Sequence, residues 1–566
     1  MKFKKSKKYI NNDIDPDEIF LDSKNLPNFN TQQFEGRLEK SISKRSLFFL
    51  GAFFSLVFLF FSWKAFTLQI LKGDEYLKKS ENNSLKKEPI FADRGLIYDR
   101  NGVPLAWNES EDKNTIDQFA FLRRAYYKEP GFGLLLGYTS APATDASGRF
   151  WQENFIGKDG IEKVYDKELT GINGVKVTQE DVKGVVQYEN VVTEKIPGRN
   201  INLTIDSRIQ SKMHERIAEM ARNSSFSGGA GMIMDLENGE LLTMTSFPEY
   251  NSNVLSSGKD KETIQGYFTD KRKVFLNRPV AGLYAPGSIV KPFIGYAALV
   301  ENVIDPNKNI LSNGSISVPN PYKKGAKTIF KDHGSFGYVD MRRAIAVSSD
   351  VYFYQIGGGY QDQPGLGISK IQKYMKLFGV EDKTNIDINS EKQSIIPNPG
   401  WKAKTFKGEA WYLGDTYNTS IGQYGFQVTP IDMLRAVGSL ANGGELVTPH
   451  LNKDSIDLAN KKQNINLDLD KLKIIHQGMR LTVTEGTGKA LDLEKIKVAA
   501  KSGTAQVGYG NTNTNSWIIG FFPYEKPRYA FVVLMERGPK SASGNATRVM
   551  REVLDYMTIY TPEYLQ

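Results

Sequence analysis

A serine and a lysine stand three residues apart in the stretch YAPGSIVKPF, at Ser288 and Lys291. Pro286 and Gly287 predict a turn before them, and Pro292 suits the first turn of a helix, where a missing N–H costs little. A helix that opens near Ser288 places the serine and the lysine one turn apart on the same face. A lysine whose charge is disfavoured can take the proton of a serine hydroxyl, so the pair predicts a nucleophile and its base.

The S-x-x-K spacing alone is weak evidence for a catalytic pair, because it recurs in this chain. Other matches include Ser41 with Lys44, Ser84 with Lys87 and Ser256 with Lys259. A motif is a hypothesis that its context must support. The rest of the chain therefore decides whether Ser288 and Lys291 do chemistry.

Two further motifs follow the first along the chain. The stretch AVSSDVYFY contains Ser348 and Asp350 at the start of an aromatic helical segment, and alone it reads as the N-cap of a buried helix. The stretch KSGT, residues 501–504, lies in a predicted strand and is the only K-[ST]-G in the chain. Its glycine indicates either a bulge or a place where a ligand approaches the strand backbone. Three concordant motifs are much stronger evidence than any one of them.

The composition is that of a large folded protein. The chain has 566 residues, of which 40% are hydrophobic and 24% are charged, and this length allows several domains with a sizeable core. It contains no cysteine, which excludes disulfides and thiol chemistry and leaves histidine and carboxylate ligands for any zinc ion. The net charge of +9 favours anionic partners but is spread thinly, and no nucleic-acid-binding motif is present.

The amino-terminal region predicts a membrane anchor. Residues 47–63 are uncharged and apolar, and residues 65–71 can extend the run beyond Lys64, which suits a spanning helix. A cleaved signal peptide is the alternative, but this run exceeds the usual ~7 to 15 residues and no A-x-A-like site follows. Lys44, Arg45 and the tail KFKKSKK place residues 1–46 in the cytoplasm by the positive-inside rule. The remainder then lies outside.

A β-rich domain is predicted between the membrane and residue 200. Residues 72–90 are polar and rich in lysine, as in a stalk. Asn101-Gly102 is a strong hairpin signal between the apolar runs GLIY and VPLAW. Short strand-like runs follow, and residues 198–206 read as a strand that leads into a helix at 208–221. We therefore place a domain boundary near residue 200.

The remaining residues predict an α+β domain. Asn238-Gly239 joins two apolar runs in a second hairpin, helical patterns fill the middle, and strand patterns return near the carboxyl terminus. Strands first, helices in the middle and strands last suit an antiparallel sheet flanked by helices. The final helix is predicted to bury the apolar face of Val549, Met550, Val553, Leu554 and Met557.

The order S-x-x-K, S-x-[DN], K-[ST]-G is the signature of the penicillin-recognising serine acyl transferases. From residue 91 to its end, the chain resembles the class B penicillin-binding proteins. RGLIYDRNG, GIEKVYDKELTG, LTIDSRIQ, MDLENGELLTMTSFPEYNSN and LNRPVAGLYAPGSIVKPF match their patterns in order. Within this class, the chain is most similar to elongation-type members. It has Asp350 where division-type relatives usually have asparagine, and its stretch AWYLGDT also resembles the elongation type.

This resemblance implies a domain organisation and a function. The parts are a cytoplasmic tail (1–46), a transmembrane anchor (47–71), a membrane-proximal pedestal of the dimerisation type (72–200) and a transpeptidase domain (201–566) outside the bacterial cytoplasmic membrane. The implied activity is that of a peptidoglycan D,D-transpeptidase, which cross-links stem peptides during cell elongation and is acylated by β-lactams. The alternatives are a D,D-carboxypeptidase and a non-catalytic β-lactam sensor or scaffold, although residues 1–46 are short for a signalling domain.

The resemblance assigns a catalytic role to five residues. Ser288 is the nucleophile and Lys291 is its general base. Ser348 relays a proton to the leaving amine, and Asp350 orients Ser348 or Lys291. Lys501 acts electrostatically: it attracts the substrate carboxylate and disfavours the charged form of Lys291.

The resemblance also implies the groups that bind the substrate. Ser502, Gly503 and Thr504 line the place of the terminal carboxylate, which Ser502 and Thr504 anchor. The backbone N–H groups of Ser288 and Thr504 form the oxyanion hole, in which one donor is usually worth ~3 kcal/mol.

The resemblance implies partners but no cofactor. The partners are peptidoglycan stem peptides, β-lactams, the membrane and a polytopic glycan polymerase of the shape, elongation, division and sporulation type; no nucleic acid is expected. Some relatives hold zinc near the second motif. Here Asp332 and His333 are weak candidates only, because the cysteine is absent and the donor set is incomplete. We therefore expect no metal.

Two stretches depart from the family pattern. Between Trp107 and Leu122 the chain is too short for the usual head of the pedestal, which puts partner contacts there in question. GQYG, Gly422 to Gly425, replaces the more usual GQG and is expected to alter a loop near the donor site.

Overall fold

The computed structural model describes residues 43–110, 121–147, 149–180, 186–459, 461–542 and 545–565. Most of the predicted cytoplasmic tail lies outside these described residues. The chain divides into two compact units, of which one comprises residues 1–86 and 179–187 and the other comprises residues 87–178 and 188–566.

A long apolar helix dominates the first unit. α1 (Lys44–Phe66) continues through a π-helical turn, η4 (Thr67–Leu71), to give a helix of 28 residues. The Ser43 side chain caps its start by accepting a hydrogen bond from the Ser46 amide at 3.1 Å. No residue of α1 is buried, and the helix is long and apolar enough to cross a membrane. A long apolar helix is confirmed where the membrane anchor is predicted, and it starts at Lys44.

The segment predicted as a stalk has regular secondary structure. It forms helix α2 (Gly73–Ser84) and strand β1 (Leu85–Ile90). In a three-stranded sheet of order β1-β9-β10, β1 is joined by β9 (Gly174–Glu180) and β10 (Val186–Thr193). These two strands are the strand-like runs that the sequence indicates.

A four-stranded sheet of order β11-β2-β3-β4 forms around the first predicted hairpin. β2 (Ile97–Tyr98) and β3 (Pro104–Glu109) are joined at the expected turn, where Gly102 has a φ of +83° that favours glycine. β4 (Arg123–Tyr126) pairs with β3, and β11 (Ile201–Asn202) pairs in parallel with β2. The hairpin is confirmed, whereas the strand predicted at 198–206 is only two residues long.

A buried ion-pair cluster lies beside these sheets. The Glu162 carboxylate accepts hydrogen bonds from Arg94 at 2.6 Å and from Arg124 at 2.7 Å. Because a buried carboxylate is costly without partners, both arginines are needed here. The short elements of the region are α3 (Gly133–Leu136), β5 (Thr139–Ser140), β6 (Ala143–Thr144), β7 (Phe150–Gln152), β8 (Ile156–Gly157), α4 (Gly160–Val164) and α5 (Asp166–Leu169).

The central sheet of the second unit has five strands in the order β13-β12-β22-β21-β20, and every neighbouring pair is antiparallel. The predicted antiparallel sheet is therefore confirmed. The Asn238-Gly239 turn joins β12 to β13 as expected. The strands are β12 (Gly228–Asp235), β13 (Leu241–Phe247), β20 (Ala499–Val507), β21 (Asn513–Phe522) and β22 (Tyr529–Pro539).

Helices cover both faces of this sheet, because neighbouring side chains of a strand point to opposite faces. α6 (Ser207–Asn223) and α19 (Asn545–Tyr560) share a core with Ile233 on one face. α16 (Pro430–Ala441) shares a core with Met232 on the other. The apolar face predicted for α19 is fully buried: Val549, Met550, Val553, Leu554 and Met557.

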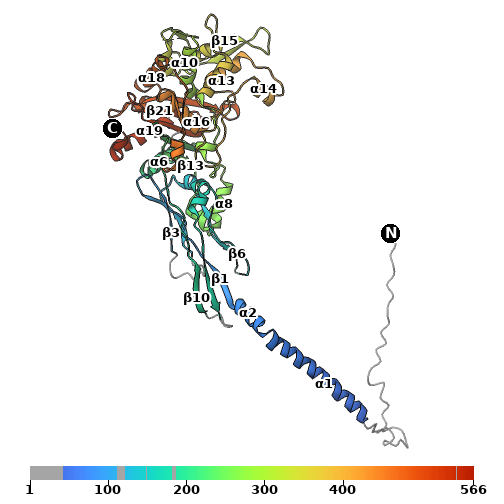
Figure 1. Cartoon of the computed structure of the whole chain (residues 1–566). Helices are drawn as coiled ribbons and strands as arrows, with labels where there is room; N and C mark the ends of the chain where they lie inside the picture. Colours follow the sequence, from blue (N-terminus) through green and yellow to red (C-terminus); the bar gives the residue numbers. More distant parts are fainter. Residues whose placement is uncertain are drawn as a thin grey trace, which may run out of the picture. The chain divides into compact units, whose positions relative to one another are not determined.

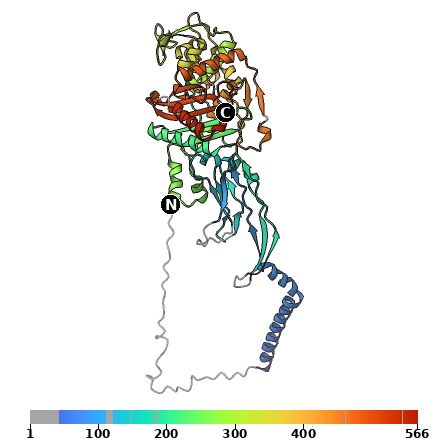
Figure 2. The same cartoon turned by 90° about the vertical axis from the view of Figure 1, so that its left-hand side faces the viewer.

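A helical lobe adjoins the sheet and surrounds α10 (Lys291–Val300). Figure 1 shows α10, α13 and α18 gathered on one side of the sheet, and Figure 2 shows the same arrangement turned by 90°. The further helices of the unit are α7 (Ser252–Ser257), α8 (Lys261–Thr269), α9 (Arg278–Ala281), α11 (Met341–Val347), α12 (Asp350–Gly358), α13 (Gly367–Leu377), α14 (Pro399–Thr405), α15 (Leu413–Ser420), α17 (Ile456–Ala459) and α18 (Leu469–Thr484). Two-stranded pairs are β14 (Ile310–Ser312) with β17 (Gly337–Val339), β15 (Ser315–Pro319) with β16 (Lys327–Lys331) and β18 (Glu445–Val447) with β19 (Lys462–Asn464).

Candidate active site

The first motif lies at the junction of two helical turns. Gly287 begins a 3-10 turn, η5 (Gly287–Val290), and Lys291 begins α10, with Pro292 in its first turn. The predicted helix start is confirmed, although its first turn is 3-10 rather than α. Gly287 has a φ of +58°, and a Cβ there would lie 2.9 Å from the carbonyl oxygen of Thr504. The glycine therefore lets the turn approach the strand that carries the third motif.

The second motif lies at the break between two helices. α11 ends at Val347, Ser348 has a left-handed φ of 62°, and α12 begins at Asp350. The N-cap of α12 is Ser349, whose hydroxyl accepts a hydrogen bond from the Tyr352 amide at 3.2 Å. The N-cap that the sequence indicates in Ser-Ser-Asp is therefore present, but Ser349 supplies it rather than Ser348 or Asp350. Both side chains are instead free to contact a lysine.

Lys291 is fully buried and contacts three oxygen atoms of the second motif. Its Nζ donates to the Ser348 carbonyl oxygen at 2.5 Å, to Ser348 Oγ at 3.2 Å and to Asp350 Oδ1 at 2.6 Å. These three acceptors match the three donors of a lysine ammonium. The fold thus joins the first motif to the second.

Lys501 completes the cluster from strand β20. Its Nζ donates to Ser348 Oγ at 2.9 Å and to the Ser502 carbonyl oxygen at 2.8 Å. Ser348 Oγ therefore lies between the amino groups of Lys291 and Lys501. The three motifs predicted from the sequence converge at this hydroxyl.

The charges of the cluster act on one another. Burial, and then the charge of Lys291, lower the pKa of Lys501 well below its ordinary value. At Asp350, burial alone would raise the pKa, but the charge of Lys291 and then the polar contacts with His333 and Lys291 outweigh it and lower the pKa. The charge of Lys291 therefore acts on Lys501, whereas the expected effect of Lys501 on Lys291 stays a prediction.

Strand β20 forms one edge of the five-stranded sheet and pairs with β21 without a change of register at Gly503. The predicted alternative of a glycine bulge is therefore wrong. A Cβ on Gly503 would lie 2.8 Å from Ile289 Cγ2, so the glycine admits η5 to the strand. Ser502 Oγ lies 2.6 Å from Thr487 Oγ1, a contact that the sequence analysis missed because no motif marks Thr487.

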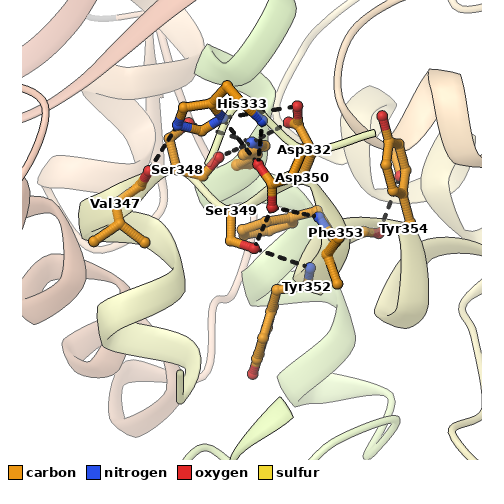
Figure 3. A network of polar contacts seen from close by, with 12 residues as sticks. Asp332, His333, Val347, Ser348, Ser349, Asp350, Tyr352, Phe353 and Tyr354 are labelled. Atoms are coloured by element: carbon orange, nitrogen blue, oxygen red, sulfur yellow. Dashed lines mark hydrogen bonds and ion pairs between the residues drawn. The ribbon is translucent and has the colours of Figure 1, made fainter. Parts of the chain in front are cut away.

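Asp332 and His333, the weak metal candidates, lie beside Asp350. Each of the three offers one donor atom within 4.8 Å of the others. The His333 Nδ1 atom lies 2.9 Å from Asp332 Oδ1 and 3.9 Å from Asp350 Oδ2, and Nε2 lies 3.2 Å from the Val347 carbonyl oxygen. Figure 3 shows the ring with one edge toward Val347 and the other toward the two carboxylates.

This donor set does not fit a structural zinc ion. Such a site needs four ligands free of protons, and within the described part of the chain only these three donors meet. Asp332 Oδ2 already accepts hydrogen bonds from Ser349 Oγ at 2.8 Å and from the Val351 amide at 2.9 Å. Hydrogen bonding to Asp332, and then to Asp350, raises the pKa of His333 to about 9, which favours a proton over a metal on its ring.

The GQYG stretch touches the first motif, as a loop near the donor site is expected to do. The Gly287 amide donates to the Gly422 carbonyl oxygen at 2.9 Å. Tyr424 has a φ of 62°, and its ring lies 5.7 Å from Lys402 Nζ and 5.9 Å from the centre of the Trp401 ring. The shortened head of the pedestal, by contrast, falls mostly on residues 111–120, outside the described residues.

Two family models match the chain. The penicillin binding protein transpeptidase domain matches residues 229–555, and the penicillin-binding protein dimerisation domain matches residues 120–203. The first match contains all three motifs and covers more than half of the chain.

Curated and solved relatives resemble the chain over most of its length. The peptidoglycan D,D-transpeptidase MrdA of Haemophilus influenzae is 28% identical over 93% of this chain and 94% of its own. A structure of a complex between penicillin-binding protein (PBP2) and MreC from Helicobacter pylori has a TM-score of 0.68 and 27% identity, and covers 85% of this chain and 99% of that one. Pseudomonas aeruginosa PBP2 in complex with WCK 5153 also has a TM-score of 0.68, with 29% identity over 83% of this chain and 96% of that one.

Proposed function

Because the chain belongs to the penicillin-binding protein transpeptidase family, we propose that it is a membrane-anchored peptidoglycan D,D-transpeptidase of class B, of the elongation type. The observation that carries the proposal is the position of Ser348 Oγ, 3.2 Å from Lys291 Nζ and 2.9 Å from Lys501 Nζ. This position unites the three motifs of a serine acyl transferase in one buried cluster. No finding favours the carboxypeptidase, sensor or scaffold alternatives.

The first half-reaction makes an acyl-enzyme. Ser288 Oγ attacks the carbonyl carbon of the penultimate D-alanine of a stem peptide, and its proton passes to Lys291 Nζ. The C–N bond then breaks and terminal D-alanine leaves, with the proton returned to its amine through Ser348 Oγ. A β-lactam undergoes the same attack, but its leaving amine stays tethered, so that the enzyme remains acylated.

Lys291 must lose a proton before it can accept one from Ser288, and the geometry offers a route. Ser348 Oγ receives a hydrogen bond from Lys291 and can pass its own proton to Lys501. Lys501 is suited to the neutral form that such a transfer requires, because burial and the neighbouring charge lower its pKa. Asp350 holds Lys291 at 2.6 Å and keeps its amino group in place during the transfer.

The substrate lies along β20 in this proposal. Within the described residues, β20 pairs with β21 alone, so its outer edge can hydrogen-bond an extended peptide. The hydroxyls of Ser502 and Thr504 anchor the terminal carboxylate, and Gly503 keeps the strand close to η5. The backbone N–H groups of Ser288 and Thr504 form the oxyanion hole.

The second half-reaction forms the cross-link. The amine of a second stem peptide attacks the acyl carbon, Ser288 Oγ leaves with a proton, and a new amide bond results. Nascent glycan must lie nearby, so the partner that we propose is a polytopic glycan polymerase of the shape, elongation, division and sporulation type.

The chain is a single-pass protein of the inner membrane. We propose that residues 1–46 lie in the cytoplasm, that residues 72–200 form the pedestal and that residues 201–566 form the periplasmic transpeptidase domain. Lys44 and Arg45 at the start of α1 support this orientation through the positive-inside rule.

The test is covalent labelling of the full chain in detergent with a fluorescent penicillin, followed by intact-mass analysis. We expect one label per chain, none on Ser288→Ala, and cross-linked products when glycan with pentapeptide stems is supplied. Labelling that persists on Ser288→Ala, or a folded wild type that takes no label, contradicts the proposal. Trimmed stems without cross-links would instead identify a carboxypeptidase.

A further inference from the structure

His333 lies next to the catalytic cluster, but the acyl-transfer steps do not use it. It follows β16 in the chain, and its side chain is 49% exposed. The ring nevertheless lies close to three groups: the carboxylates of Asp332 and Asp350 and the carbonyl oxygen of Val347. Asp332, which holds it, is itself fully buried at its side chain. A half-exposed imidazole therefore bridges a buried carboxylate and the turn at Ser348.

Both ring nitrogens of His333 face oxygen acceptors. Nδ1 lies 2.9 Å from an oxygen of Asp332, and Nε2 lies 3.2 Å from the carbonyl oxygen of Val347. A neutral imidazole has one donor and one acceptor nitrogen, whereas an imidazolium has two donors. Only the imidazolium satisfies the two acceptors together, so the geometry favours the cation.

The cation acts on the carboxylate that holds Lys291. Asp350 offers Oδ1 to Lys291 at 2.6 Å, and its other oxygen, Oδ2, lies 3.9 Å from His333 Nδ1. Rotation of the carboxylate would weaken both contacts at once. The imidazolium thus attracts Oδ2 through a long ion pair, which favours the orientation that keeps Oδ1 on the catalytic lysine.

The same ring also fixes the backbone at the break between α11 and α12. Val347, whose carbonyl it binds, immediately precedes Ser348 with its left-handed φ of 62°. A non-glycine residue in this conformation needs support from its surroundings. His333 supplies it from one side, and Asp332 supplies it from the other through Ser349 Oγ at 2.8 Å.

We propose that His333, as an imidazolium, is a positioning residue for acyl transfer: it orients Asp350 on Lys291 and holds the Ser348 turn between the two lysines. This inference rests on the proposed function. His333 touches no reacting atom, and it acts only through Asp350 and the carbonyl of Val347. The site needs a planar cation that donates in two directions.

The experiment compares His333→Gln, which is neutral, with His333→Arg, which keeps a planar cation with several donors. Acylation of the full chain by a fluorescent penicillin is measured over a range of concentrations, which separates the maximal acylation rate from the half-saturating concentration. We expect His333→Gln to lower the maximal rate ~10- to 100-fold with little change in half-saturation, because small misplacements in an active site have effects of this size. His333→Arg should retain most of the rate.

Lys331→Ala is the matched control. Lys331 is an exposed cation at the end of the same strand, β16, and its removal should leave both acylation parameters unchanged. The circular dichroism and melting temperature of each variant show whether it folds. If His333→Gln acylates at the wild-type rate, the inference is wrong.

Two further outcomes distinguish the inference from its rivals. If wild-type protein carries zinc at one ion per chain, and a chelator slows acylation as much as His333→Gln does, the ring is a metal ligand and the inference fails. If His333→Arg is as slow as His333→Gln, a cation at this place is insufficient and the inference also fails. If wild type itself is not acylated at Ser288, the proposed function fails instead.

Discussion

Lys291 and Glu249 are both buried ionisable side chains, but their surroundings differ. Lys291 donates to three oxygen atoms, one of which belongs to a carboxylate. Glu249 accepts hydrogen bonds from the backbone amides of Gly131 at 2.5 Å and Gly133 at 2.8 Å, and no lysine or arginine is paired with it in the described residues. The Nε2 atom of His214 lies 3.7 Å from its carboxylate.

The two regions show what decides the state of a buried charge. In the active site, opposite charges and matched acceptors keep Asp350 ionised despite its burial. At Glu249, burial outweighs the backbone hydrogen bonds and raises the pKa to about 7. At His214, burial and then Arg222 lower the pKa to about 4, and neither ring nitrogen has a hydrogen-bond partner among the described residues. Compensated charges can serve chemistry, whereas uncompensated ones make stability depend on pH.

The largest effect should come from removing the lysine that compensates the buried carboxylate of the active site. Lys291→Met removes the general base and leaves Asp350 without its lysine, so acylation should fall ~10³-fold or more. The free energy of unfolding should also fall by ~3 kcal/mol, because a buried ion pair has lost one partner. Penicillin labelling and urea denaturation measure the two effects. Adding Asp350→Asn should restore part of the stability but no activity; unchanged stability in Lys291→Met would contradict the account.

A smaller loss should follow when Lys501 can no longer become neutral. Lys501→Arg keeps a positive charge at the site, but a guanidinium does not lose its proton in proteins. We expect acylation to fall ~10²-fold while the half-saturating penicillin concentration changes little. Stopped-flow labelling checks this. An active Lys501→Arg would show that Lys501 acts by charge alone and that the proton route through Ser348 is wrong.

Glu249→Gln tests the second region, in which the buried charge is not compensated, and should change how stability depends on pH. The folded-state pKa of about 7 lies above the ordinary 4.5, so this group's stabilisation is fully present below pH 4.5 and is lost as the pH rises through 7. The uncharged variant should be more stable than wild type by ~2 kcal/mol at pH 8, after ~1 kcal/mol is deducted for the weakened backbone hydrogen bonds. Denaturation at several pH values measures it. A variant that is less stable at pH 8 would show that the Glu249 carboxylate is not destabilising.

The smallest effect should come from His214→Phe. The folded-state pKa of about 4 lies below the ordinary 6.5, so stability is present above pH 6.5 and is lost as the pH falls toward 4. The variant should gain ~1 kcal/mol relative to wild type at pH 5.5 compared with pH 8. The new ring can pack on Phe247, whose ring centre lies 5.8 Å from that of His214. An identical pH profile in variant and wild type would overturn this assignment.

Local sequence signals predicted much of the fold. The apolar run predicted the helix at α1, Asn-Gly predicted the turns at Gly102 and Gly239, and short apolar runs predicted the long strands of the central sheet. Each of these features depends on neighbours a few residues apart, which sequence periodicity reports directly. The three motifs were readable for the same reason.

The sequence could not predict the contacts that join distant segments. The sequence did not predict the left-handed φ of Ser348 between α11 and α12, because only the tertiary packing imposes it. The contact of His333 with Val347 spans 14 residues, and Lys501 reaches Ser348 across 153. No periodic pattern encodes such distances.

The sequence by itself determined which groups are available for chemistry: the S-x-x-K motif at Ser288, the S-x-D motif at Ser348, the K-S-G motif at Lys501 and an apolar anchor. The tertiary structure decided their states. It placed Lys501 where burial and Lys291 lower its pKa, gave Asp350 its compensating cations and left Glu249 without one. The physical reason is that the energy of a charge depends on its burial and on the charges within a few ångströms, and both are properties of the folded chain.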